Sequence, residues 1–132
     1  MKNNIKGIHH IALKCPGIES YNKTVGFYCD ILGLPIKRSW GDGLLSGIML
    51  DTGAGMLEIF ANGEGLPEES LVRHFAFDVE DPDACIEAVR TAGYEVTMEP
   101  DDIIIESNPP YPARIAFCKG PLGEEIEFFK VK

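Results

Sequence analysis

The six residues HFAFDV at positions 74–79 and the four residues HIAL at positions 10–13 decide the fold of this chain. In each stretch apolar residues stand one and three positions after the histidine, and a strand sends such neighbours to the face opposite the histidine. Glu58 and Glu127 follow the same rule, because an apolar residue stands on each side of them. The sequence therefore predicts four strands, each with an apolar face and a histidine or glutamate on the other face.

The rest of the chain places these strands in two halves with one order of elements: strand, helix and three strands. In the first half the predicted elements are strands at Ile8–Cys15, Pro35–Trp40, Leu44–Asp51 and Met56–Ala61 and a helix at Ser20–Leu32. In the second half they are strands at Leu71–Val79, Tyr94–Met98, Arg114–Cys118 and Glu125–Val131 and a helix from Asp81 to Gly93. Such a repeat decides the architecture, because each half is one structural module.

Cap residues mark the ends of both predicted helices. Ser20 is the predicted N-cap of the first helix, and Asp81, followed by Pro82, is that of the second. Gly33 and Gly93 stand where a helix commonly ends in a glycine. These signals separate each helix from the strands on either side.

The predicted fold class is α+β. We expect a single domain over residues 1–132, made of module 1 (7–62) and module 2 (71–132), with a polar linker between them. Two such modules form a curved mixed sheet with the helices on its convex face. The segment Pro100–Pro112 is expected to be an irregular loop that acts as a lid or pocket wall or packs at a dimer interface.

Composition and charge exclude several classes of function. The chain has 132 residues and a formal net charge of −9, which opposes binding to nucleic acid or to an anionic membrane. No stretch is long and apolar enough to span a bilayer. The four cysteines are widely separated and form no Cys-x-x-Cys motif, so we expect reduced thiols and a cytoplasmic location. The expected partner is a small-molecule substrate.

The two histidines and two glutamates on the predicted strands, His10, Glu58, His74 and Glu127, have the chemistry of metal ligands. Imidazole and carboxylate together suit zinc, nickel, cobalt, manganese or ferrous iron. Four such ligands leave positions open on a six-coordinate metal, as catalysis requires. A single histidine or glutamate is usually hydrogen-bonded or solvated, but equivalent places in two modules favour one metal site. His9 is predicted on the helix-facing side, as a structural or rim histidine.

The order of several motifs resembles the vicinal oxygen chelate superfamily, the glyoxalase I and bleomycin-resistance group. The matching segments are His10–Leu13, Phe27–Tyr28, Leu32–Leu34, Met56–Ile59, His74–Val79 and Gly120–Gly123 leading to Ile126–Phe128. The resemblance covers nearly the whole chain. It implies two βαβββ modules around a metal, and it assigns the ligand positions to the same two histidines and two glutamates.

The His/Glu/His/Glu set looks like that of short bacterial glyoxalase I. The resemblance implies a metal-dependent lyase or isomerase that moves a proton on a metal-chelated thiol adduct of a 2-oxoaldehyde. Glu127 would be the catalytic base, with Glu58 as the alternative. The implied cofactor is one divalent metal, nickel or zinc first and cobalt, manganese or iron as alternatives. A homodimer is implied as well, with each site built from one chain or from two.

Three further residues are candidates for binding the substrate. Asn62, four residues after Glu58, matches an asparagine that contacts glutathione in the family. Lys14 stands where the family has an arginine, and lysine does not reproduce the two-pronged grip of arginine on a carboxylate. Arg114 is a further cationic candidate. Trp40 and Phe60 are predicted to line a pocket or to pack in the core.

Other functions in the same family remain open. A metal-dependent epimerase of a branched acyl-CoA needs the same metal and base, although the epimerases compared carry glutamine at the position of Glu58. A drug- or metabolite-binding resistance protein needs no metal. Thiol transfer to an epoxide antibiotic requires a cationic cluster, for which the candidates are Lys14, Arg38, Arg73 and Arg114. An extradiol dioxygenase uses two histidines and only one carboxylate.

Overall fold

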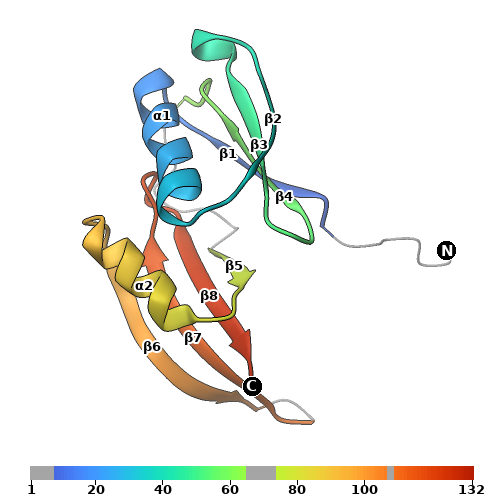
Figure 1. Cartoon of the computed structure of the whole chain (residues 1–132), viewed down its shortest axis with the longest axis vertical. Helices are drawn as coiled ribbons and strands as arrows, with labels where there is room; N and C mark the ends of the chain where they lie inside the picture. Colours follow the sequence, from blue (N-terminus) through green and yellow to red (C-terminus); the bar gives the residue numbers. More distant parts are fainter. Residues whose placement is uncertain (1–7, 65–73, 107–108) are drawn as a thin grey trace, which may run out of the picture. The chain divides into compact units, whose positions relative to one another are not determined.

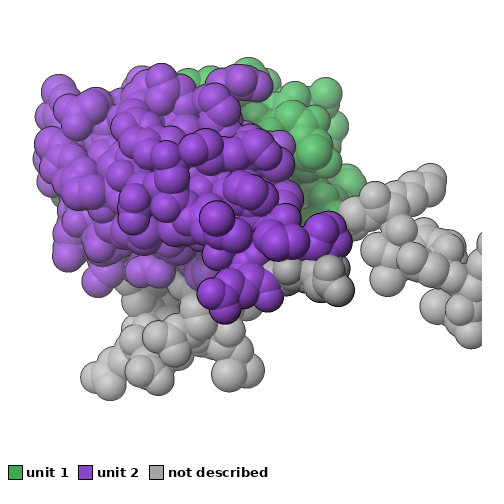
Figure 2. All heavy atoms as spheres, turned by 90° about the horizontal axis from the view of Figure 1, so that it is seen from below, with its two compact units in different colours: residues 1–29, 33–65 green, residues 30–32, 66–132 purple. Residues whose placement is uncertain are grey.

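The computed structural model describes residues 8–64, 74–106 and 109–132, and the chain divides into two compact units. Unit 1 comprises residues 1–29 and 33–65, and unit 2 comprises residues 30–32 and 66–132 (Figure 2). Most of the predicted module 1 therefore lies in unit 1, and module 2 lies in unit 2. Arg73 and the first residues of the predicted strand Leu71–Val79 lie outside the described residues.

Unit 1 contains a four-stranded mixed sheet with the strand order β1-β4-β3-β2. The chain order is β1 (His10–Lys14), α1 (Ile18–Gly26), a π-helical turn (Phe27–Ile31), β2 (Ile36–Trp40), a 3₁₀ turn (Gly43–Leu45), β3 (Gly47–Asp51) and β4 (Met56–Phe60). Strands β1 and β4 are parallel, and the other pairs are antiparallel. A parallel pair needs a long crossover, which α1 and two further strands provide here.

Unit 2 repeats this topology with the strand order β5-β8-β7-β6. Its elements are β5 (His74–Asp78), α2 (Pro82–Thr91), β6 (Val96–Ile105), β7 (Tyr111–Lys119) and β8 (Glu125–Val131). Again the outer strand β5 is parallel to its neighbour β8 and the other pairs are antiparallel. The predicted α+β class and the predicted order of elements in the two modules are confirmed (Figure 1).

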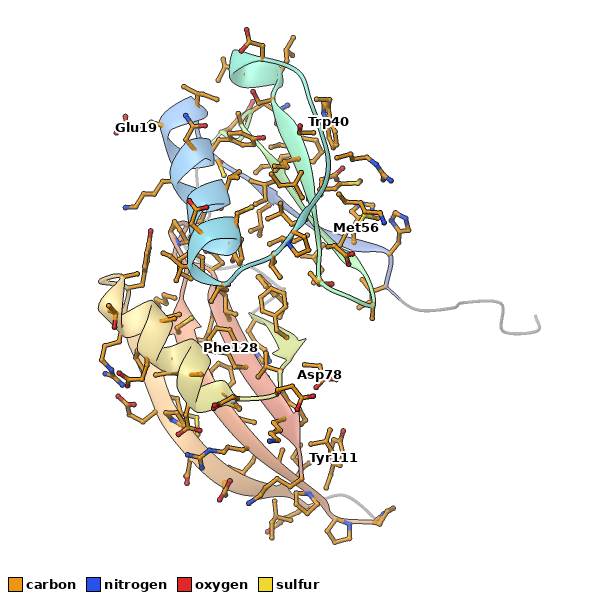
Figure 3. All side chains as sticks on the ribbon, in the orientation of Figure 1. Glu19, Trp40, Met56, Asp78, Tyr111 and Phe128 are labelled. Carbon is orange, nitrogen blue, oxygen red and sulfur yellow. The ribbon has the colours of Figure 1, made fainter. Side chains whose placement is uncertain are left out.

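Each sheet buries the apolar face that alternation predicted. In unit 2, α2 packs on β6, β7 and β8, and Phe128 lies between this helix and the sheet (Figures 1 and 3). Ile126 and Phe128 of β8 and Ile86 and Val89 of α2 are at most 1% exposed. In unit 1 the equivalent residues of β4, Leu57 and Ile59, are 2% and 0% exposed. Burying each large apolar side chain contributes about 1.5–3 kcal/mol, so these faces hold the strands in register.

The second helix follows its sequence signals, whereas the first departs from them. The Asp81 side chain accepts a hydrogen bond from the backbone N–H of Ala84 at 3.1 Å, and α2 ends before Gly93, which has φ of 87°. Helix α1 begins at Ile18, two residues before the predicted cap Ser20. Its N-cap is Gly17, with φ of 100° and no side-chain hydrogen bond. The prediction of Ser20 as the cap is therefore wrong.

The bounds of one predicted strand and the nature of one predicted loop are also corrected. The predicted strand Leu44–Asp51 starts only at Gly47, because residues 43–45 form a 3₁₀ turn in which Asp42 accepts from the N–H of Gly43. The predicted irregular loop Pro100–Pro112 is wrong over most of its length, since residues 101–105 pair with β7. Pro100 is tolerated in β6 because this is an edge strand, whose outer side needs no N–H donor.

Candidate metal and substrate site

The two sheets place a histidine and a glutamate together at equivalent positions. In the parallel pair of unit 1, Ala12 stands opposite Glu58, and in unit 2 Ala76 stands opposite Glu127. Each histidine comes two residues before that alanine, so it shares the face of the glutamate. The register of strand pairing is therefore the same in both modules, and it creates one His–Glu pair in each.

In unit 1, His10 and Glu58 lie close enough to bind one ion. The distance from His10 Nε2 to Glu58 Oε1 is 3.5 Å, and the two side chains are 40% and 12% exposed. The carboxylate is thus largely withdrawn from water while the imidazole is open on one side. Met56 and Trp40 lie on the face away from α1 (Figure 3), and the strand register puts His10 and Glu58 on this same face.

In unit 2, His74 and Glu127 form the corresponding pair. His74 Nε2 lies 3.2 Å from Glu127 Oε2, with side-chain exposures of 42% and 12%. Burial raises the pKa of the Glu127 carboxyl above its ordinary value, an effect that Glu125 reinforces and His74 opposes. The ring of His74 also meets the ring of Phe117 edge-on, with centroids 5.3 Å apart. Sequence reasoning missed Phe117, because the contact depends on the pairing of β7 with β8.

The geometry of each pair fits two neighbouring ligands of one divalent metal. Bonds of about 2.1 Å place two ligand atoms ~3.0 Å apart at a right angle and ~3.4 Å apart at a tetrahedral angle. The observed separations of 3.5 Å and 3.2 Å are close to these values. Within residues 8–64, 74–106 and 109–132, no three His, Cys, Asp or Glu side chains form a metal-binding group, so the predicted ligands stand as two pairs.

His9 takes part in the unit 1 pair, which alternation did not predict. Strand β1 begins at His10, so His9 precedes the strand and is exposed. Its Nδ1 lies 2.9 Å from Nδ1 of His10, and the two rings meet edge-on with centroids 5.1 Å apart. The prediction that His9 faces the helix side is wrong, because the alternation of a strand applies only within the strand.

Two of the three candidate substrate residues belong to the β1–β4 region of unit 1. Lys14 ends β1 on the same face as His10, opposite Phe60 of β4. Asn62 follows β4 and forms an isolated bridge with Pro16. Both side chains belong to exposed residues at the end of the β1–β4 pair that is farther from His10. Their role as substrate contacts stays a prediction.

Arg114, the third candidate, lies on the opposite face of its sheet from His74 and Glu127. Arg114 lies in β7, opposite Lys130 of β8. Its guanidinium donates to Asp83 of α2 from Nε at 2.6 Å and from Nη2 at 2.7 Å. Nη1 donates to Asp102 at 3.2 Å. This network ties α2 to the sheet and occupies the guanidinium. Arg114 as a substrate contact stays a prediction, and its position on the α2 face does not support it.

Trp40 and Phe60 lie on the Glu58 face of unit 1. Their rings meet at 6.1 Å between centroids, and Trp40 is 39% exposed. A Cβ on Gly47 would come within about 2.3 Å of the Trp40 ring, so the indole lies directly over the backbone of β3. The absence of a side chain at Gly47 is therefore what allows an aromatic surface beside Glu58.

The described residues contain no helix that is both long and apolar enough to cross a membrane. The four cysteines, all within the described residues, form no disulfide, and burial raises the pKa of Cys118 to about 12. A thiol with so high a pKa is a poor nucleophile. Cys118 is therefore not a candidate nucleophile.

The chain is similar to several known proteins. The chain is 29% identical to the uncharacterized protein YaeR of Escherichia coli K12, over 96% of this chain and 97% of that protein. It is similar to the crystal structure of a putative glyoxalase family protein from Bacillus anthracis, with a TM-score of 0.73, 23% identity and full coverage of both chains. It is also similar to lactoylglutathione lyase from Agrobacterium tumefaciens, with a TM-score of 0.63, 18% identity and coverage of 96% and 94%.

The two structural likenesses establish the fold alone. Membership of a family rests on a separate match, between residues 7–128 and the family model described as Glyoxalase/Bleomycin resistance protein/Dioxygenase superfamily. That match spans both His–Glu pairs. The chain therefore belongs to the glyoxalase/bleomycin resistance protein/dioxygenase superfamily.

Proposed function

We propose that this protein is a metal-dependent lyase or isomerase of the glyoxalase I type, in which His10, Glu58, His74 and Glu127 hold one divalent metal. The observation that carries the proposal is the identical register of the two His–Glu pairs, with nitrogen-to-oxygen distances of 3.5 Å and 3.2 Å. Each module supplies two ligands. Nickel or zinc is the proposed metal, since imidazole and carboxylate suit both.

The charges of the four side chains support a catalytic rather than a purely structural metal. Two neutral imidazoles and two carboxylates balance a dication. Four ligands leave two positions of an octahedral metal free for a substrate with two neighbouring oxygens. The family also contains proteins that bind drugs without a metal, and for these a set of four intact ligands has no purpose.

The bound metal would supply Lewis acidity and make a carbon beside a carbonyl group more acidic. Glu127 would remove the proton from the carbon that carries sulfur and hydroxyl and return it to the adjacent carbonyl carbon, giving a 2-hydroxyacyl thioester. Glu127 is preferred to Glu58 because the family resemblance gives it this role. Burial alone does not separate the two carboxylates, whose side chains are both 12% exposed, but it raises the pKa of Glu127, and a carboxylate withdrawn from water is the stronger base.

Lys14 and Asn62 are the proposed contacts for the thiol part of the substrate. Both are exposed residues at the end of the β1–β4 pair farther from His10. An ammonium group and an amide bind a carboxylate or a peptide group, but they do not form the bidentate pair of an arginine. A small acidic thiol other than glutathione is therefore the proposed co-substrate. We also propose a homodimer that acts in the cytoplasm.

The test combines metal analysis with an activity assay. Protein purified without chelator is expected to carry one divalent metal per chain, and His10→Ala and His74→Ala are each expected to lose it. Glu125→Gln is the matched control, because Glu125 lies on the same strand and face as Glu127 but two residues away. Metal-loaded wild type is then assayed with methylglyoxal and several thiols.

The outcomes separate the candidate functions. A protein that takes up no metal would remove the lyase and the epimerase together and leave a binding protein. A protein that binds metal but converts no thiol adduct would exclude the lyase and move the proposal to epimerisation of an acyl-CoA. Mixing refolded His10→Ala and His74→Ala chains shows where the pairs meet: regain of about a quarter of the activity requires two chains to share a site.

A further inference from the structure

The two ring nitrogens of His10 have different partners. Nε2 faces Oε1 of Glu58 at 3.5 Å, whereas Nδ1 lies 2.9 Å from Nδ1 of His9. In a hydrogen bond between two imidazole nitrogens one donates and the other accepts, so the protons of the two rings are linked. The tautomer of His10 therefore depends on His9.

The backbone fixes His9 in this position. The N–H of Met56 donates to the carbonyl of His9 at 2.9 Å, next to the first residue pair of β1 and β4. A Cβ on Gly55 would lie 2.8 Å from the carbonyl oxygen of Ile8 and 3.3 Å from that of His9. Glycine at position 55 thus permits the close approach that places the His9 ring against His10.

A histidine that binds metal through Nε2 must carry its proton on Nδ1. Metal-binding histidines nearly always donate this Nδ1–H to a nearby acceptor, which fixes the ring and makes Nε2 more basic. Among the described residues, Nδ1 of His9 is the group within hydrogen-bond distance of Nδ1 of His10. His9 then carries its own proton on Nε2, which is exposed to water.

We infer that His9 is a positioning residue for the metal ligand His10: it accepts the Nδ1–H of His10 and so presents an unprotonated Nε2 to the metal. This inference rests on the proposed metal site. Module 2 has no such arrangement in its sequence, because the residue before His74 is Arg73, which carries donors only. There the His74 ring is oriented by packing against Phe117. The two halves of the site would therefore orient their imidazoles by different means.

The test compares two substitutions in the full-length protein. His9→Phe keeps an aromatic ring of similar shape but removes the acceptor, and His9→Asn restores an acceptor oxygen near the place of Nδ1. Zinc affinity is measured by competition with a chromophoric chelator. His9→Phe is expected to weaken zinc binding by roughly 10–100-fold, and His9→Asn by less than about threefold. In nitrogen-15 NMR spectra of the zinc form, the Nδ1–H of His10 is expected in wild type and His9→Asn and absent in His9→Phe.

The zinc-binding results distinguish an error in the role of His9 from an error in the proposed metal site. Wild type that binds no zinc overturns the metal proposal itself and this inference with it. Wild type and His9→Phe binding zinc equally overturn the role of His9 alone. An equal loss of affinity in His9→Phe and His9→Asn also overturns it, because the loss would then follow the shape of the imidazole and not its acceptor. Thermal unfolding of the metal-free variants checks that both fold.

Discussion

The two modules share one backbone arrangement but differ in what surrounds the His–Glu pair. In module 1 the same face carries Lys14, Arg38 and Trp40. In module 2 the equivalent face carries Asp78, which lies on the side away from α2 (Figure 3), and Asp101. One half of the repeat thus offers cationic and aromatic groups, and the other offers further carboxylates.

This difference teaches which part of the repeat is constrained. The strand register fixes where a histidine and a glutamate meet, so both modules keep it. The positions beside the pair contribute nothing to the apolar face that holds the sheet together, so they are free to differ. We propose that these unequal surroundings correspond to unequal tasks, substrate binding in the first module and proton transfer in the second. The predictions below test this division.

The largest expected effect separates the two glutamates. At saturating metal, Glu127→Gln is expected to lower kcat by roughly 10²–10⁴-fold, because the amide cannot accept the proton. Glu58→Gln is expected to weaken metal binding with a smaller loss of kcat. Steady-state kinetics over a range of metal concentrations measures both, with Glu125→Gln as the control. A larger kcat loss in Glu58→Gln would give the base to module 1 and reverse the comparison.

The next effect concerns the apolar faces opposite the pairs. Ile59 and Phe128 each follow the glutamate of their module and are at most 1% exposed. Phe128→Ala is expected to cost about 3–5 kcal/mol of unfolding free energy and Ile59→Ala about 2–5 kcal/mol, because each leaves a cavity. Chemical denaturation monitored by circular dichroism measures the cost. A loss below about 1 kcal/mol at either position would show that its module is not held by this face.

A smaller effect on unfolding free energy is expected at the N-caps of α1 and α2. Asp81→Ala is expected to cost about 0.5–2 kcal/mol, because the N–H of Ala84 loses its acceptor. At the start of α1, Gly17→Ser would add a capping hydroxyl, yet it is expected to destabilise by about 1–3 kcal/mol since the φ of 100° is strained for any side chain. Thermal unfolding of the two variants measures the contrast. Stabilisation by Gly17→Ser would show that the backbone at residue 17 relaxes without cost.

The smallest effect is a pH dependence of stability. Because burial raises the folded-state pKa of Glu127, its carboxylate form costs folding free energy above that pKa, and the cost disappears as the pH falls through the folded and then the ordinary pKa. Metal-free Glu127→Gln is therefore expected to melt slightly above wild type at pH 7, and the difference is expected to vanish at pH 4. Calorimetry at both pH values with chelator present measures it. A lower melting temperature at pH 7 would mean that the pair with His74 outweighs burial.

Sequence patterns predicted most of the frame. Strand β8 has the predicted bounds, and Asp81, Pro82 and Gly93 mark α2 as expected, because these signals are local. The start of α1 was missed since a glycine N-cap carries no sequence signal. The first part of β6 was predicted as the strand Tyr94–Met98, but its second part was predicted as a loop because Pro100 and two irregularities in the pairing with β7 interrupt the alternation. Edge strands tolerate both features, and edge position is a tertiary property.

The four proposed ligands were chosen by alternation, and the structure brings them together as two pairs. Arg114 was a candidate by charge alone, and charge does not say which face a side chain takes. Its pairing with Asp83 and Asp102 depends on the packing of α2 across the sheet. Phe117 was missed because its contact with His74 joins residues of two strands that are not neighbours in the sheet. His9 was assigned to the helix-facing side because alternation was extended to a residue that precedes β1.

By itself, the sequence determined that the chain repeats one module and that in each repeat a histidine and a glutamate lie on the side opposite the apolar face. It could do so because the two-residue period of a strand is a local property of the backbone. Only the tertiary structure decided that His10 stands beside Glu58 and His74 beside Glu127, and that Arg114 faces α2 instead. These partners are far apart in the chain, and the register that joins them is set by hydrogen bonding between strands and by burial against the helices.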